Sequence, residues 1–146
     1  MLVRNVMSSP VITATAETTI RGAAEKMRAN GVGALPVLQD YRPIGIVTDR
    51  DIVIHALAAR GFALGPDTRI EDIITPNVIT CFGDQDASEA ATLMGEIRIR
   101  RLLVIDRSGA AVGMLSIGDI AEHVSEELAG QALGEISEAR AGDIPN

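Results

Sequence analysis

The chain has 146 residues, enough for one compact domain, which at about this size buries roughly two thirds of the surface exposed by the unfolded chain. Apolar residues make up 47% of it, but Trp is absent and aromatic residues are only 2%, so a core has to be built from aliphatic side chains and Met. The formal net charge of -7 argues against a nucleic acid or an anionic membrane as partner, and the few rings leave no stacking surface for single-stranded nucleic acid.

Cysteine usage and the lack of long apolar runs predict a cytoplasmic protein. Cys81 is the single cysteine, so one chain can form neither a disulfide nor a thiolate metal site. No stretch reaches the roughly 18 apolar residues of a membrane span, and residues 1–9 lack the apolar segment of a signal peptide. We therefore expect no membrane insertion.

The first half of the chain is predicted to form strand, helix, strand, strand and helix. Strands are expected at 11–13, 34–38 and 44–48, with a turn at 40–43 and a second helix from about residue 49. The first helix is expected to begin at a Thr18 cap. It carries apolar residues at i, i+3, i+4 and i+7, which predicts one buried stripe: Ile20, Ala23, Ala24 and Met27.

The second half repeats this order. Strands are expected at 78–81, 102–106 and 111–116, with a second helix from about residue 117. Asp86 and Glu89 have the spacing of a capping box at the start of its first helix. The buried stripe of that helix is expected to be formed by Ala87, Ala90, Ala91 and Met94.

The last helix is predicted to continue beyond the length of its counterpart, to about Arg140. Its apolar residues recur every fourth position along one face: Val124, Leu128, Ala132 and Ile136. This stripe needs a surface that buries it. It either covers its own domain or docks on a second subunit.

The two halves are an internal repeat. Ala23 and Met27 match Ala90 and Met94 at a spacing of about 67 residues, and Asp51 matches Asp119 after one added residue at 107–109. The predicted fold is α/β (α+β), with two pseudo-symmetric β-α-β-β-α repeats that form one compact pair. The expected division is 1–60 for repeat 1, 61–71 for the linker, 72–128 for repeat 2, and 129–146 for a helical extension and tail.

Both repeats carry the same polar motif where a strand ends and a helix begins. Segments 45–51 and 113–119 each contain Gly, two apolar residues, a hydroxyl, two spacers and Asp. The hydroxyl and the first helical amides favour a phosphate, the Asp can accept from ribose hydroxyls, and the Gly is expected to allow a ligand to approach closely. A hydroxyl and an Asp also cap helices without any ligand, but the duplication of the motif favours ligand binding.

The repeats resemble the CBS (cystathionine-β-synthase) domain. Segments 6–13, 32–37 and 45–51 carry the resemblance, and 73–80, 99–104 and 113–119 echo it, so that it covers roughly residues 4–128. It implies a regulatory module that binds an adenosine-containing ligand in clefts between the repeats: AMP, ADP, ATP, S-adenosylmethionine or NAD. It also implies energy sensing, a homodimer formed through the repeat helices and a separate effector protein.

The resemblance implies two clefts, each shared between the repeats. The first would contain Ile46, Thr48, Arg50, Asp51, Ile74, Asn77, Ile79, Ile99, Arg100 and Arg101. The second would contain Met7, Pro10, Ile12, Val32, Gly33, Ala34, Met114, Ser116 and Asp119.

The clefts are expected to differ in charge, because Gly33 and Ala34 stand where the first cleft has Arg100 and Arg101. The first is therefore predicted to prefer nucleotides with charged tails, and the second to bind more weakly, to take a less anionic ligand or to stay empty. The two arginines can alternatively form a solvated strand end. Adjacent strand residues point to opposite faces, so only one of them can contact phosphate, and Arg50 is a second candidate cation.

No motif for catalysis is visible. His55 and His123 have no nucleophile nearby in sequence, and nucleophile-elbow, Walker and zinc-ligand spacings are absent. We therefore expect no enzyme, no catalytic cofactor and no metal site. Two functional classes remain: a nucleotide-sensing regulatory module, and a ligand-free structural subunit that dimerises.

Overall fold

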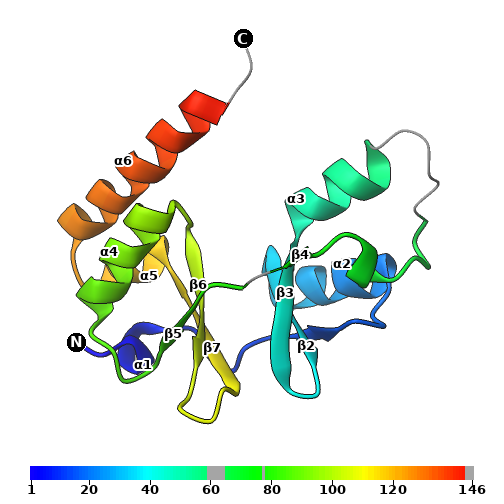
Figure 1. Ribbon diagram of the computed structural model, residues 1–146, viewed down its shortest axis with the longest axis horizontal. Helices are drawn as coiled ribbons and strands as arrows, with labels where there is room; N and C mark the ends of the chain where they lie inside the picture. The colour runs from blue at the N-terminus through cyan, green and yellow to red at the C-terminus, as the bar shows by residue number, and fades with distance from the viewer. Residues whose placement is uncertain (59–64, 77, 144–146) are drawn as a thin grey trace. The chain divides into compact units, whose positions relative to one another are not determined.

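The computed structural model describes residues 1–58, 65–76 and 78–143, and side chains up to residue 137. The chain divides into two compact units. Unit 1 contains residues 1–11 and 79–146, and unit 2 contains residues 12–78. Each unit has its own sheet and helices, and the fold is mixed α/β (Figure 1). Residues 61–64 of the expected linker lie outside the described residues.

Unit 1 is built on a three-stranded sheet in the order β5-β6-β7. β5 and β6 are parallel, and β6 and β7 are antiparallel. The strands are β5 (Thr80–Phe82), β6 (Arg101–Ile105) and β7 (Ala111–Ser116). The helices are α1 (Val3–Val6), α4 (Ala87–Ile97), α5 (Ile117–His123) and α6 (Glu126–Asp143).

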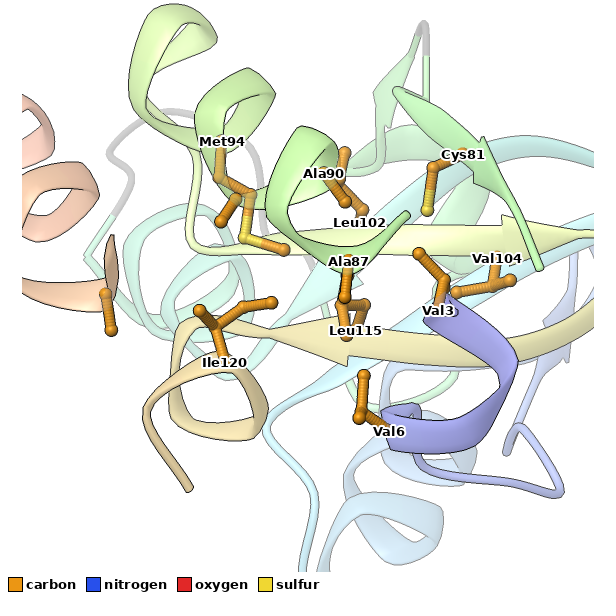
Figure 2. Packing of buried hydrophobic residues seen from close by; sticks show 12 residues of the cluster. Val3, Val6, Cys81, Ala87, Ala90, Met94, Leu102, Val104, Leu115 and Ile120 are labelled. Carbon is orange, nitrogen blue, oxygen red and sulfur yellow. The ribbon is translucent and has the colours of Figure 1, made fainter. Parts of the chain in front are cut away.

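The core of unit 1 lies between this sheet and its helices (Figure 2). Met94 of α4, Leu102 of β6 and Leu115 of β7 are fully buried there, together with Val3 of α1. The predicted stripe of α4 is confirmed, because its three alanines and Met94 are all buried. Small side chains let α4 pack closely on the sheet, which suits a core without large rings.

The prediction of one long final helix is wrong. α5 ends at His123, Val124 leaves helical geometry with φ -120 and ψ -68, and α6 begins at Glu126. The cause is local, since the Ser125 hydroxyl accepts from the amide of Leu128 at 3.2 Å and so caps a new helix. α6 packs against α4 and α5 and buries Ala129, Ala132 and Ile136. The stripe therefore covers its own unit.

Unit 2 has a four-stranded sheet in the order β1-β2-β3-β4. Its core is formed by Ile20, Leu35, Val37, Val47 and Ile70, with others around them. The strands are β1 (Ala14–Thr15), β2 (Ala34–Gln39), β3 (Arg42–Thr48) and β4 (Thr75–Pro76). The helices are α2 (Ile20–Asn30), α3 (Asp49–Asp51), the π-helix η1 (Ile52–Leu57) and the 3-10 turn η2 (Ile70–Asp72).

Several local predictions need correction. The first strand of each repeat begins a few residues later than predicted, at Ala14 and at Thr80. Ala24 was predicted to belong to the buried stripe of α2 but is exposed. Only Ile20, Ala23 and Met27 of this helix are buried, so its buried side is narrower than predicted. The α2 cap is Thr19, whose hydroxyl accepts from Gly22, since Thr18 bonds to Thr15 instead.

The predicted capping box at α4 is also wrong. Asp86 does cap the helix, but its carboxylate accepts from the amide and hydroxyl of Ser88, and Glu89 takes no part. The Asp86 side chain is short, and its carboxylate bonds to the donors of Ser88, two residues away, in preference to a donor three residues away.

Each sheet is extended by the segment that precedes the other repeat. In unit 1, Ser8 and Met114 exchange backbone hydrogen bonds of 2.9 and 3.0 Å. In unit 2, β4 pairs with Gly45 and Ile46 of β3. We call residues 6–10 and 73–76 the approach segments. The unit 2 sheet therefore contains strands from both repeats, and the unit 1 sheet gains an isolated bridge from the segment before repeat 1.

The motif glycines make room for the approach segments, which corrects the expectation that they make room for a ligand. A Cβ at Gly45 would lie 2.7 Å from the carbonyl oxygen of Thr75, and one at Gly113 would lie 2.8 Å from that of Ser8. Backbone atoms cannot move away without breaking the pairing. Only glycine fits at these two positions.

We predict that Gly45→Ala lowers the free energy of unfolding by about 1–3 kcal/mol, because the added methyl overlaps the backbone of β4. The measurement is urea denaturation followed by circular dichroism. Gly130→Ala is the matched control, since Gly130 lies in α6 with no atom within 4 Å of an added Cβ, and there alanine should stabilise by about 0.5–1 kcal/mol. Equal stability of Gly45→Ala and the parent protein would contradict this account.

Candidate functional site

In unit 2 the predicted polar motif forms a capping box where β3 ends and α3 begins. The amide of Asp51 donates to the Thr48 hydroxyl at 3.0 Å, and the amide of Thr48 donates to Oδ2 of Asp51 at 2.9 Å. Both side chains are partly buried. The box fixes the position of the carboxylate relative to the end of the strand.

Unit 1 has the same junction between β7 and α5. The amide of Asp119 donates to the Ser116 hydroxyl at 3.1 Å, and the amide of Ser116 donates to Oδ2 of Asp119 at 2.8 Å. The capping alternative therefore accounts for one carboxylate oxygen in each unit. Among the described residues, no hydrogen bond reaches the Oδ1 atom of Asp51 or of Asp119, and this oxygen can accept from a ligand hydroxyl.

The first amides of the helix at the unit 2 junction are already bonded within the protein. The Asp49 amide donates to the carbonyl of Gly33 at 2.9 Å, and the Arg50 amide donates to Oδ1 of Asp49 at 2.8 Å. The Asp51 amide is held in the capping box. The expectation that these amides receive a phosphate is therefore wrong for this junction. A phosphate here needs a cationic side chain.

The two junctions share one backbone contact but differ in which of its two residues is charged. The Ile117 amide donates to the Arg100 carbonyl at 3.0 Å, as the Asp49 amide does to Gly33. In unit 2 the Asp49 carboxylate occupies the space beside Gly33, since a Cβ built there would lie 2.9 Å from its Oδ2. The equivalent backbone hydrogen bond therefore involves an arginine residue as acceptor in unit 1 and an aspartate residue as donor in unit 2.

Asp49 was missed by sequence reasoning, because within the motif it counted only as a spacer. The signal was available in the sequence: Asp49 occupies the position of the apolar Ile117 in the second repeat. A spacer that changes from apolar to charged between repeats points to a difference between the sites.

The structure divides the residues predicted for the first cleft between the two units. Unit 2 contains Ile46, Thr48, Arg50, Asp51 and Ile74, and unit 1 contains Ile79, Ile99, Arg100 and Arg101. Asn77 lies outside the described residues. Within unit 2, Ile74 lies against Gly45, one residue from Ile46 on β3. Arg50, Arg100 and Arg101 are all exposed.

The residues predicted for the second cleft divide in the opposite way. Unit 1 contains Met7, Pro10, Met114, Ser116 and Asp119, and unit 2 contains Ile12, Val32, Gly33 and Ala34. Within unit 1 the approach segment brings Met7 against Gly113, next to Met114. In each unit, therefore, an approach segment lies beside the strand that leads to the capping box.

The described part of the chain contains one thiol and no assembled metal site. The Cys81 thiol is buried, and burial raises its pKa to about 11, so it stays protonated near neutral pH. The described residues contain no group of three or more His, Cys, Asp or Glu placed to hold a metal ion. Across the same residues, no helix combines the length and the apolar character that crossing a membrane requires.

Comparison with known proteins identifies the family. The profile described as "CBS domain" matches residues 3–57 and 70–126. The chain belongs to the CBS domain family. It is similar to the CBS domain-containing protein YhcV of Bacillus subtilis (strain 168), with 34% identity over 138 residues that span 92% of this chain and 94% of that protein.

Solved CBS structures have a similar fold. One is the CBS domain protein PAE2072 from Pyrobaculum aerophilum complexed with AMP, with a TM-score of 0.72, 27% identity, and coverage of 94% of this chain and 99% of that one. Another is the CBS domain pair of protein MJ0100 with methylthioadenosine and S-adenosyl-L-methionine, with a TM-score of 0.73, 31% identity, and coverage of 84% and 94%.

We predict that Thr48→Val and Ser116→Ala each lower the free energy of unfolding by about 1 kcal/mol without ligand, because each removes one acceptor of a capping box in this CBS pair. Chemical denaturation measures the loss. Thr92→Val is the matched control, since the Thr92 hydroxyl lies on the exposed side of α4 and bonds only to the Ser88 carbonyl. A loss as large in the control as in the two cap variants would argue against a special role of the caps.

Proposed function

We propose that this CBS pair is a non-catalytic regulatory module that binds an adenine nucleotide of the AMP, ADP or ATP class. Each cleft would combine the capping box of one repeat with residues of the other, as given above. Its output would pass to a separate effector protein, as an energy sensor does. We place it in the cytoplasm, in accord with its acidic surface and single buried thiol.

The observation that carries this proposal is the duplicated capping box. In both units a carboxylate is held by the end of a strand with Oδ2 engaged and Oδ1 without a hydrogen bond among the described residues. An apolar approach segment lies beside the same strand. Ribose hydroxyls need an acceptor, and adenine needs apolar contacts, so the two features together suit an adenosine.

The charges at the junctions support unequal clefts. The first cleft would include Arg100, Arg101 and Arg50, whereas the second would include Gly33 with the Asp49 carboxylate beside it. A phosphate is attracted by the first set and repelled by the second. We infer that the first cleft takes phosphorylated nucleotides and that the second favours a neutral or cationic adenosine compound, such as S-adenosylmethionine.

A second candidate function is that of a ligand-free structural subunit that dimerises through its helices. It is supported by η1, which leaves Val53, Ile54 and Leu57 exposed at 52%, 43% and 78%. Neighbouring apolar side chains on one exposed helix are a common sign of an interface. Homodimerisation through this helix is compatible with sensing as well, so ligand binding is the property that separates the two functions.

Ligand binding should appear as a rise of the melting temperature with AMP, ATP, NAD or S-adenosylmethionine at millimolar concentration, because a ligand stabilises only the folded state that binds it. The absence of any shift with all four would favour the structural role. Release of phosphate from ATP by the purified protein would contradict the non-catalytic assignment.

We predict that Asp51→Ala weakens AMP binding more than Asp119→Ala does, because only the first cleft has arginines for the phosphate. Titration calorimetry on both variants measures the difference. The two variants are matched, since each removes the same capping box, so their losses of folding stability should be similar. Equal losses of affinity would contradict unequal clefts.

We predict that Asp49→Asn, in the Asp51→Ala background, strengthens AMP binding at the second cleft about fivefold. One charge about 4 Å from a phosphate charge costs about 1 kcal/mol where water screens the pair fully, which corresponds to about fivefold in affinity. Asparagine can still accept the 2.8 Å hydrogen bond from the Arg50 amide, so the local fold is kept. Adenosine, which lacks the phosphate, is the control ligand; an equal gain for adenosine would show that the effect is not electrostatic.

A further inference from the structure

Unit 1 contains a cavity of about 320 Å³ that no predicted cleft accounts for. It lies where the parallel strands β5 and β6 end side by side, with Gly83 after one strand and Asp106 after the other among its lining residues. α1 closes one side, since the Arg4 amide donates to the Gly83 carbonyl at 2.9 Å. The carboxyl ends of neighbouring parallel strands are a common place for ligands in α/β folds.

The cavity lies away from the capping box of the same unit. Val112 lines it near the start of β7, whereas Ser116 ends that strand. Four residues of extended strand separate the two positions by about 13 Å. Met7 lines the cavity and also belongs to the residues predicted for the second cleft, so the two places have one side chain in common.

The inner lining is apolar. Met7, Phe82, Ile105 and Val112 all contribute to it, and each is only partly buried. They are apolar side chains with exposed surface that a ligand can cover. A hollow at the lower end of the size range of small-molecule sites suits a single ring or a short hydrocarbon chain.

Arg107 and Asp84, which also line the cavity, form an ion pair. Arg107 donates from Nε and Nη2 to the two carboxylate oxygens of Asp84, at 2.9 and 2.7 Å. Its guanidinium carbon lies 3.9 Å from the centre of the Phe82 ring. The hydrogen bonds from Arg107 lower the pKa of Asp84, so the pair stays charged at neutral pH. The guanidinium therefore contacts both the aromatic wall of the cavity and the Asp84 carboxylate.

The remaining acidic group of the rim is also engaged. Oδ1 of Asp106 accepts from the amides of Ser108 and Ala110 at 2.9 and 3.0 Å, within the turn that follows β6. Arg4 is exposed, and within the described part of the chain its guanidinium makes no salt bridge and no hydrogen bond, although its charge contributes to the lowered pKa of Asp84. Arg4 therefore adds to the cavity lining a cation whose hydrogen-bond donors are not used by other described residues.

We propose that this cavity is a separate ligand site for a small organic acid. The carboxylate of the ligand pairs with Arg4, and its hydrocarbon or aromatic part lies against Phe82 and Ile105. The nucleotide clefts are not required for this binding.

The test uses the full chain and benzoate as the probe, with the methyl groups of Met, Ile and Val labelled for NMR. Benzoate at concentrations on the order of 10 mM should shift the methyl signals of Met7, Ile105 and Val112 in a saturable way. Benzamide has the same ring without the charge. It should bind about tenfold more weakly, since a hydrogen bond to a charged group is worth about 1.5–3 kcal/mol.

Arg4→Gln should reduce benzoate affinity about tenfold and leave benzamide affinity unchanged, because only the charge is lost. The backbone amide of residue 4 still donates to Gly83, so folding is not expected to suffer. Arg28→Gln is the matched control, since Arg28 is an exposed arginine on α2 in unit 2.

Three results would overturn the proposal. One is the absence of a saturable shift at Ile105 and Val112. Another is equal affinity of the parent protein for benzoate and benzamide, which is informative even if a variant fails to fold. The third is a loss of benzoate affinity in Arg28→Gln as large as that in Arg4→Gln, which would assign binding to overall charge.

Discussion

Backbone pairing between the segment before one repeat and the last strand of the other is the contact on which both units depend. Ser8 pairs with Met114, and Thr75–Pro76 pair with β3. The pairing requires a glycine on the receiving strand, because a Cβ there would overlap a backbone carbonyl. The unit 2 sheet therefore includes β4 from the second repeat, and the unit 1 sheet is bridged by the segment before the first repeat. The same pairing carries apolar side chains of each approach segment to the strand that ends at a capping box.

The capping boxes explain how one pair of side chains can have a structural and a binding role. Oδ2 of each Asp and the neighbouring hydroxyl satisfy the backbone where the strand becomes a helix. These hydrogen bonds engage Oδ2 of each carboxylate and thereby fix the position of Oδ1. Because the first amides at the unit 2 junction are bonded inside the protein, the proposed phosphate would have to be bound by arginine side chains. The two junctions also differ in the charged side chains beside them.

The two units share a backbone contact but place residues of opposite charge at it. The contact between the first helical amide and the preceding strand is the same in both units, but it involves Arg100 in one and Asp49 beside Gly33 in the other. Duplication supplies the common backbone, and a few side chains differentiate the sites. The cavity at the carboxyl ends of β5 and β6 adds a place with a different chemistry, an apolar lining below an arginine.

The order of elements in each repeat, the buried stripe of α4 and the membership of the CBS family followed from the sequence, because periodicity, turn residues and motif spacing are local or repeated signals. Local patterns did not predict the caps at Thr19, Ser88 and Ser125. Several hydrogen-bond partners lie nearby at each of these places, and the geometry of the chain decides which pair forms. Only the tertiary structure decided that the motif glycines face approach segments, that the Asp49 carboxylate lies beside Gly33, and that Arg4 lines a cavity together with apolar side chains. Each of these facts depends on a contact between residues far apart in the chain or on opposite sides of a turn, and no spacing in the sequence encodes such a contact.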